Sequence, residues 1–215
     1  MKQVLVLATF MGLTIFTYAQ KGLRLNVIGA YAFDDSYEVF QDANTYYNGT
    51  VKGGFQYGGS IEYLPSAYGS IELSYVGQST TSPANFKFGQ IGPKHEDFNV
   101  TLNYILLGGN GYFPYDSKKI QGYAGMFGGV VFAGVESPST GNSGDNTSFA
   151  WGGKLGANIW VSEKIGIKVQ ALLLSSSRVT GGDTYWSWYG PIYLNTYSTL
   201  WQFSLGGGLT FKLGQ

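Results

Sequence analysis

Apolar side chains recur at every second position in one segment after another from residue 23 to the end of the chain. Side chains of a β-strand point alternately to its two faces, so this period predicts strands with one apolar and one polar face. The last segment shows the pattern most clearly. Its apolar face holds Trp201, Phe203, Leu205, Gly207, Leu209, Phe211 and Leu213, and its polar face holds Gln202, Ser204, Gly206, Gly208, Thr210 and Lys212.

The alternation divides the chain into strands at residues 23–33, 55–63, 70–75, 98–106, 121–135, 151–161, 165–174 and 201–213. Short turns at 65–67, 114–117 and 162–163 alternate with long polar connectors at 34–52, 79–97, 136–147 and 179–196. An even number of strands joined by alternating short and long connectors is typical of an up-and-down barrel with both termini on the short-turn side. The sequence therefore predicts one all-β domain, an eight-stranded antiparallel barrel.

Composition decides which face of the predicted strands points inward. Charged residues make up only 12% of the chain, so the polar faces consist mainly of Gly, Ser, Asn, Thr and Gln. These small side chains suit the narrow lumen of an eight-stranded barrel, and the apolar faces then contact lipid. In 98–106 the same rule assigns Phe98, Val100, Leu102, Tyr104 and Leu106 to the lipid face. A secreted lipocalin-like binder, with the faces reversed, is the alternative.

The first residues have the layout of a secretory signal peptide. Lys2 precedes an apolar run over residues 4–16, and Thr17 and Ala19 are the small residues of a cleavage site. The apolar run is too short to span a bilayer as a helix. We therefore expect residues 1–20 to be cleaved and residues 21–215 to form the barrel.

The eight predicted strands and the terminal strand over 201–213 together resemble the small OmpA/OmpX-type outer-membrane β-barrels. The resemblance implies a transmembrane barrel in the outer membrane of a Gram-negative-type bacterium, exported by the secretory pathway and surrounded by outer-membrane lipid. It also implies that the terminal strand is the signal recognised by the barrel-insertion machinery. The resemblance is architectural and names no substrate.

The polar faces carry a few charges that would point into the lumen, where an ion is costly unless it is paired. They are Arg24, Glu62, Glu72, Lys154, Lys168 and Lys212. We expect Arg24 to bridge to Glu62, and Glu72 to reach a lysine across the lumen. This ion-pair network is either a static plug or a gate that opens a narrow pore with a slight preference for anions.

The last long connector is unusually aromatic. It contains Tyr185, Trp186, Trp188, Tyr189 and Tyr193. Aromatic rings on a loop offer a large contact area at low entropic cost, which favours binding of a glycan or protein ligand. The other interpretation is that this connector folds over the barrel mouth or dips into the lipid headgroups.

His95, with Glu96 and Asp97 beside it, is the remaining candidate for chemistry, as part of a lipid-modifying site at the rim. No serine is fixed beside it by the sequence, so we expect no enzymatic activity. We expect no cofactor and no metal, because no motif for either occurs. The zero net charge, without runs of one sign, argues against nucleic acid as a partner. The sequence favours a structural role in the cell envelope, with a narrow gated pore, surface adhesion and a rim enzyme as alternatives.

Overall fold

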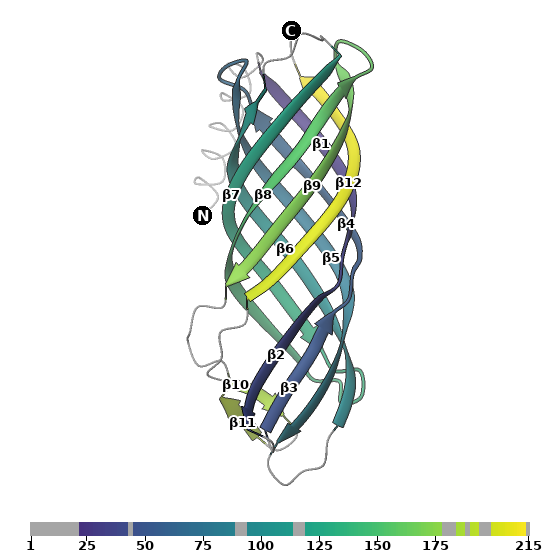
Figure 1. The fold of residues 1–215 in the computed structure, drawn as a ribbon, viewed down its shortest axis with the longest axis vertical. Helices are drawn as coiled ribbons and strands as arrows, with labels where there is room; N and C mark the ends of the chain where they lie inside the picture. Colours follow the sequence, from purple (N-terminus) through teal and green to yellow (C-terminus); the bar gives the residue numbers. More distant parts are fainter. Residues whose placement is uncertain are drawn as a thin grey trace, which may run out of the picture.

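Eight long strands wind around a closed barrel (Figure 1). The structure, a computed structural model, describes residues 22–42, 45–88, 94–113, 119–177, 184–187, 190–193 and 199–213. The barrel strands are β1 (Leu23–Ala32), β4 (Gly54–Tyr63), β5 (Gly69–Phe88), β6 (Lys94–Tyr112), β7 (Ile120–Glu136), β8 (Ser143–Trp160), β9 (Ile165–Ser177) and β12 (Thr199–Leu213). Each pairs antiparallel with its neighbours, and β12 closes the circle by pairing with both β9 and β1. The predicted eight-stranded barrel is confirmed. The part of the chain that the structure describes contains no helix capable of crossing a membrane.

Two further hairpins occur where the sequence predicted long polar connectors. β2 (Asp35–Asp42) and β3 (Thr45–Val51) pair with each other, and β3 also pairs with the outer part of β5. β10 (Thr184–Ser187) pairs with β11 (Gly190–Tyr193) as a separate two-stranded sheet. Both hairpins lie at the end of the barrel opposite to the one where β12 ends (Figure 1).

The barrel strands continue well beyond the predicted boundaries at this end. β5 and β6 stay paired from Gly69 and Gly111 to Phe86 and Lys94, so most of the predicted connector 79–97 is strand. The 20 residues of β5, at about 3.3 Å each and a tilt near 40°, rise about 50 Å. This is about twice the height of the apolar band of such a barrel, about 25 Å. Half of β5 therefore stands outside the bilayer.

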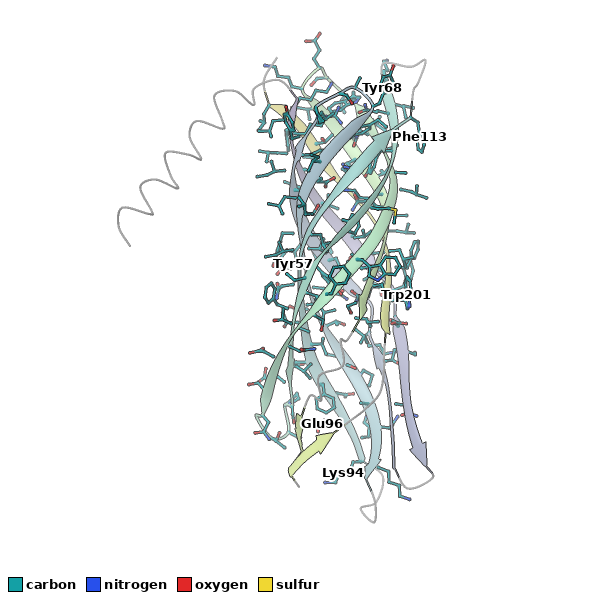
Figure 2. The ribbon with its side chains drawn as sticks, turned by 90° about the vertical axis from the view of Figure 1, so that its left-hand side faces the viewer. Tyr57, Tyr68, Lys94, Glu96, Phe113 and Trp201 are labelled. Atoms are coloured by element: carbon teal, nitrogen blue, oxygen red, sulfur yellow. The ribbon has the colours of Figure 1, made fainter. Side chains whose placement is uncertain are left out.

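A continuous apolar belt covers the outer face of the barrel toward the short-turn end. Its exposed side chains include Leu25, Val27, Ile61, Ile71, Leu73, Leu107, Met126, Leu155, Ile167, Val169, Leu205 and Leu209. Exposed Tyr68 and Phe113 lie at the short-turn end, and Tyr57 and Trp201 lie near mid-height, with Lys94 and Glu96 far beyond them (Figure 2). Aromatic residues that border an apolar band mark the two headgroup levels. The belt confirms the apolar-outward orientation and excludes the lipocalin-like arrangement.

The outer aromatic border is built from contacts between strands. The Trp151 and Trp201 rings meet edge to face with centroids 5.5 Å apart, and Phe33 stacks on Phe203 at 5.6 Å. The Tyr75 hydroxyl donates to Asn103 Oδ1 at 2.7 Å. The ring of Tyr75 thus lies at the edge of the lipid region, while its hydroxyl bonds to a polar side chain. Beyond this level the outward side chains become polar.

The predicted orientation of strand β6 is wrong over residues 98–106. Val100, Leu102, Tyr104 and Leu106 are buried in the interior, and Thr101 and Asn99 are exposed on the outside. Ile105 and Leu107 supply the lipid-facing side chains instead. The sequence misled because residues 104–107 are apolar on both faces, and because Asn99 and Thr101 lie beyond the apolar belt, where the outer face meets water.

Glycines on the inner face allow the strands to approach closely. A Cβ atom on Gly208 would lie 1.8 Å from the Val27 carbonyl oxygen, and one on Gly129 would lie 2.0 Å from the Ile105 carbonyl oxygen. No side chain fits at either position. These contacts allow the strong curvature that closure with only eight strands requires.

Candidate functional site

The interior of the barrel has two layers of different chemistry. Charged and amide side chains fill the half nearest the short turns, and a largely apolar cluster fills the half nearest the long connectors. The structure places five of the six predicted inward charges in the interior as buried side chains, and Lys212 is partly buried at the mouth. The lumen is therefore the candidate site.

Glu72 on β5 forms the buried ion pair of this lumen. Its Oε2 lies 2.5 Å from Lys154 Nζ on β8, across the interior, and both side chains are at most 5% exposed. Asn110 Nδ2 also donates to Glu72 Oε2 at 2.6 Å, and Ser74 Oγ donates to Oε1 at 3.1 Å. The stem of Lys154 brings its ammonium within 6 Å of the Tyr123 and Phe127 ring centroids, at 5.9 and 5.7 Å. The expected contact between Glu72 and a lysine across the lumen is present.

Glu62 on β4 is held by neutral donors. Ser70 Oγ donates to its Oε1 at 2.5 Å, Asn110 Nδ2 donates at 2.9 Å, and the Tyr112 hydroxyl donates to the same oxygen. Asn26 Nδ2 approaches Oε2 at 3.4 Å. Buried carboxylates need this degree of hydrogen bonding, because isolated burial of the charge is costly.

The expected bridge between Arg24 and Glu62 is not formed. The two residues are direct register partners on β1 and β4, but the Arg24 guanidinium lies 5.0 Å from the ring centroids of Tyr112 and of Trp160 instead. The Glu62 carboxylate that Arg24 faces in the register instead accepts hydrogen bonds from the Tyr112 hydroxyl and the Asn110 amide. Neither residue was predicted as part of the charge network, and Asn110 sits in the glycine-rich stretch 108–111, where the alternation is lost.

Lys168 and Lys212 make no ion pair within the described part of the chain. Lys168 Nζ is completely buried, lies 4.3 Å from the Tyr123 ring centroid and has no hydrogen-bond partner there. It interacts electrostatically with Glu62 and Glu72. Lys212 Nζ lies 3.8 Å from the Trp160 ring centroid, nearer the mouth.

Glutamines and a tyrosine form the boundary between the two layers. The amides of Gln56 and Gln202 both donate to Gln78 Oε1 at 2.9 Å, and the Tyr104 hydroxyl donates to Gln202 Oε1 at 3.1 Å. Beside them the apolar cluster contains Val100, Leu102, Tyr104, Leu106, Val131, Ala150, Leu172 and Leu174. A cavity of about 30 Å³ at this boundary, lined in part by Glu72, Lys154 and Gln170, has room for only one or two waters.

The candidate residues of the rim lie outside the bilayer and make separate contacts. His95 Nδ1 lies 2.8 Å from Asn85 Oδ1 and its Nε2 lies 3.4 Å from Asp97 Oδ1. Glu96 points elsewhere and accepts hydrogen bonds from Ser137 Oγ and, at 2.5 Å, from Ser139 Oγ. Partial burial opposes ionisation of Glu96, but these hydrogen bonds outweigh it and hold the pKa of its carboxyl below the usual value. The histidine and the serines therefore belong to two different clusters.

Three of the five aromatic residues of the predicted binding surface lie in described strands. Tyr185 and Trp186 lie on β10, where they pair with Ile192 and Pro191, and Tyr193 ends β11. Trp188 and Tyr189, and residues 1–20 of the predicted signal peptide, lie outside the described residues. Within the described ranges no three His, Cys, Asp or Glu side chains are grouped to hold a metal ion.

Comparison with solved structures relates this closed barrel to known proteins. Neisserial surface protein A aligns over 89% of this chain and 97% of its own, with a TM-score of 0.57 at 16% identity. The fold is that of the small outer-membrane barrels. Ail, the attachment invasion locus protein of Yersinia pestis, covers 88% of this chain and 99% of its own, with a TM-score of 0.43 and 15% identity. The N-terminal barrel domain of Pseudomonas aeruginosa OprF covers 89% of this chain and 100% of its own, with a TM-score of 0.38 and 15% identity.

At these identities the likeness concerns the fold alone. No family model matches the sequence, and no curated protein matches it. Sequence relatives therefore assign no role to the lumen or to the long connectors.

Proposed function

We propose that this protein is a structural, non-enzymatic barrel of the bacterial outer membrane whose lumen is closed to solutes. The observation that carries the proposal is the filled interior. A buried ion pair and its hydrogen-bond network fill the short-turn half, and an apolar cluster fills the half nearer the long connectors. An eight-stranded barrel leaves an interior that side chains can fill. Of the two interpretations of the charge network, the static plug is the one that this packing supports.

The apolar cluster closes the lumen more firmly than the charges do. Ions crossing this level would lose their hydration, and they would meet leucines such as Leu102 and Leu172 on one side of the wall and only uncharged amides and hydroxyls on the other. If Glu72 exchanged one lysine partner for another in the short-turn half, the apolar cluster would stay in place. A gate made of charges alone therefore does not open a path.

Planar-bilayer recording of the refolded barrel tests this proposal. We expect no steady conductance from the wild-type protein. The double variant Tyr104→Ala, Leu172→Ala removes two inward side chains and should conduct, whereas Ile105→Ala, Leu107→Ala removes two lipid-facing side chains of comparable size and should remain silent. A stable ohmic conductance from the wild-type protein overturns the closed-lumen proposal.

The non-enzymatic part of the proposal is supported by the surroundings of His95. Its two ring nitrogens face Asn85 and Asp97, both exposed side chains, and no described serine hydroxyl bonds to it. A general base that activates a hydroxyl needs that hydroxyl within hydrogen-bond reach. Release of fatty acid from outer-membrane lipid by the wild-type protein, lost in His95→Ala, would contradict this part.

Binding at the cell surface is a second candidate function, and the long extension of the strands favours it. β5 and β6 rise beyond the aromatic border and carry the paired hairpin β2–β3 with them. The last connector lies at the same end of the barrel, so this end would stand clear of the membrane surface and meet glycans or proteins. Attachment of cells displaying the protein to a glycan array should then depend on Trp186 and Trp188, and attachment that survives Trp186→Ala, Trp188→Ala rejects this role for the aromatic connector.

A further inference from the structure

The charges inside the short-turn half of the barrel do not balance. Four cations, Arg24, Lys154, Lys168 and Lys212, share this interior with two carboxylates, Glu62 and Glu72. Glu72 is paired with Lys154, and Lys168 interacts with both carboxylates. Arg24 and Lys212 are left without an ion-pair partner in the described structure. Both lie toward the periplasmic-type mouth, where the short turns are.

These two cations face each other directly. Arg24 on β1 and Lys212 on β12 are register partners, and their charged groups lie 5.0 and 3.8 Å from the same Trp160 ring centroid. The backbone N–H of Lys212 donates to the Lys164 carbonyl at 2.8 Å, which fixes the short turn before β9 at the same rim. Like charges directly opposite each other on neighbouring strands destabilise a sheet. We call Arg24, Trp160 and Lys212 the mouth cluster.

The mouth cluster contains a buried donor without a partner. Arg24 is only 6% exposed, yet its Nη1 has no hydrogen-bond partner within the described chain. Buried guanidinium donors are almost always satisfied, because the cost of leaving a charged donor unpaired is high. Glu163 on the adjacent turn acts on Lys212 through its charge but forms no ion pair with it. A bound anion would satisfy this donor and offset the excess of positive charge.

The depth of the mouth cluster indicates which anion fits. Arg24 lies next to the register pair Leu23 and Tyr63, and exposed Tyr63, Tyr68 and Phe113 mark the headgroup level at this end. Phosphate groups lie at that depth in a bilayer. A guanidinium fork binds phosphate oxygens bidentately, and a neighbouring lysine adds a point charge. The indole of Trp160 forms an amphipathic wall suited to this level.

We propose that the mouth cluster is a phosphate-binding site, occupied either by the headgroup phosphate of a phospholipid in the adjacent leaflet or by a free phosphate ion. Arg24 supplies the planar donors, Lys212 supplies a second charge, and the Trp160 ring contacts both cations. Bound phosphate removes the repulsion between Arg24 and Lys212 and satisfies Arg24 Nη1. The phosphate site does not depend on whether the rest of the lumen, toward the long connectors, conducts ions.

Nuclear magnetic resonance of the refolded full chain in uncharged detergent micelles tests the proposal. The indole N–H signal of Trp160, assigned by its loss in Trp160→Phe, is followed while inorganic phosphate is added to one sample and short-chain phosphatidic acid to another. Sodium chloride at matched ionic strength serves as the reference. We expect a saturable shift with at least one phosphate compound and none with chloride. The compound that saturates identifies the source of the phosphate.

Variants separate binding at the mouth cluster from general charge effects. Lys212→Gln and Arg24→Gln should each weaken the apparent affinity about tenfold, since each removes one charge-assisted contact. Lys94→Gln, which removes a lysine at the opposite end of the barrel, should leave the affinity unchanged. Heat-modifiable migration verifies that each variant is folded, and Lys212→Gln alone decides if Arg24→Gln does not fold. No saturable shift with either compound, an equal shift with chloride, or affinity unchanged in Lys212→Gln overturns the proposal.

Discussion

Removal of Lys154 tests how much the buried ion pair contributes to stability. In Lys154→Met the Glu72 carboxylate, 3% exposed in the wild-type protein, loses its contact at 2.5 Å with Nζ. Breaking a buried pair by deleting one partner typically costs about 3–5 kcal/mol, because the remaining charge stays buried. Asn110 still donates to Glu72 at 2.6 Å, and Lys168 still attracts it. We therefore expect a loss near the lower limit, about 3 kcal/mol.

Urea unfolding of the barrel in lipid vesicles, followed by tryptophan fluorescence and by the heat-modifiable gel shift, measures this loss. The double variant Glu72→Gln, Lys154→Met removes both charges and should recover a large part of it, since replacing a whole buried pair is often nearly neutral. Lys94→Met, at the exposed end, is the matched control and should unfold like the wild-type protein. If Lys154→Met unfolds with the wild-type free energy, the ion pair is not the contact that holds Glu72.

Three further predictions concern other parts of the barrel. Leu102→Asp places a charge in the apolar cluster and should lower the free energy of unfolding by several kcal/mol or prevent folding. Thr101→Asp, at the neighbouring exposed position, should fold normally. Equal effects of the two substitutions in the gel-shift assay would contradict the orientation of β6. Gly208→Ala should block closure of β1 on β12, because its Cβ would lie 1.8 Å from the Val27 oxygen, whereas Gly144→Ala, with open space around it, should give normal yields of the folded band. The hydrogen bonds from Ser137 and Ser139 keep the Glu96 pKa below its usual value, so these contacts should persist above about pH 4.3 and be lost only as the pH falls further, through the lowered pKa. Loss of the contacts should speed amide exchange of Ser139 in acid, and Glu96→Gln should not show this change. If the exchange rate of Ser139 varies with pH only as the intrinsic chemical rate does, the prediction is refuted.

The sequence by itself determined the class of fold and its orientation. Strand alternation is a local property of the chain, so β1, β4, β8 and β12 were located without knowledge of their partners. Composition then predicted which face points inward, because the small and polar side chains of most strands suit a narrow lumen and the apolar ones suit lipid. The inward position of Glu62, Glu72 and Lys154 followed from the same rule.

Tertiary structure decided the features that depend on which residues of other strands, or which solvent, a side chain meets in the closed barrel. Neither the orientation of β6 nor the strands outside the bilayer could be obtained from alternation, because beyond the belt a polar side chain such as Thr101 faces water on the outside. The partners inside the lumen were equally hidden. Arg24 faces Glu62 in the register, yet Asn110 and Tyr112 reach that carboxylate from β6. Contacts across a lumen depend on strand tilt and side-chain reach, and these become defined only when the barrel closes.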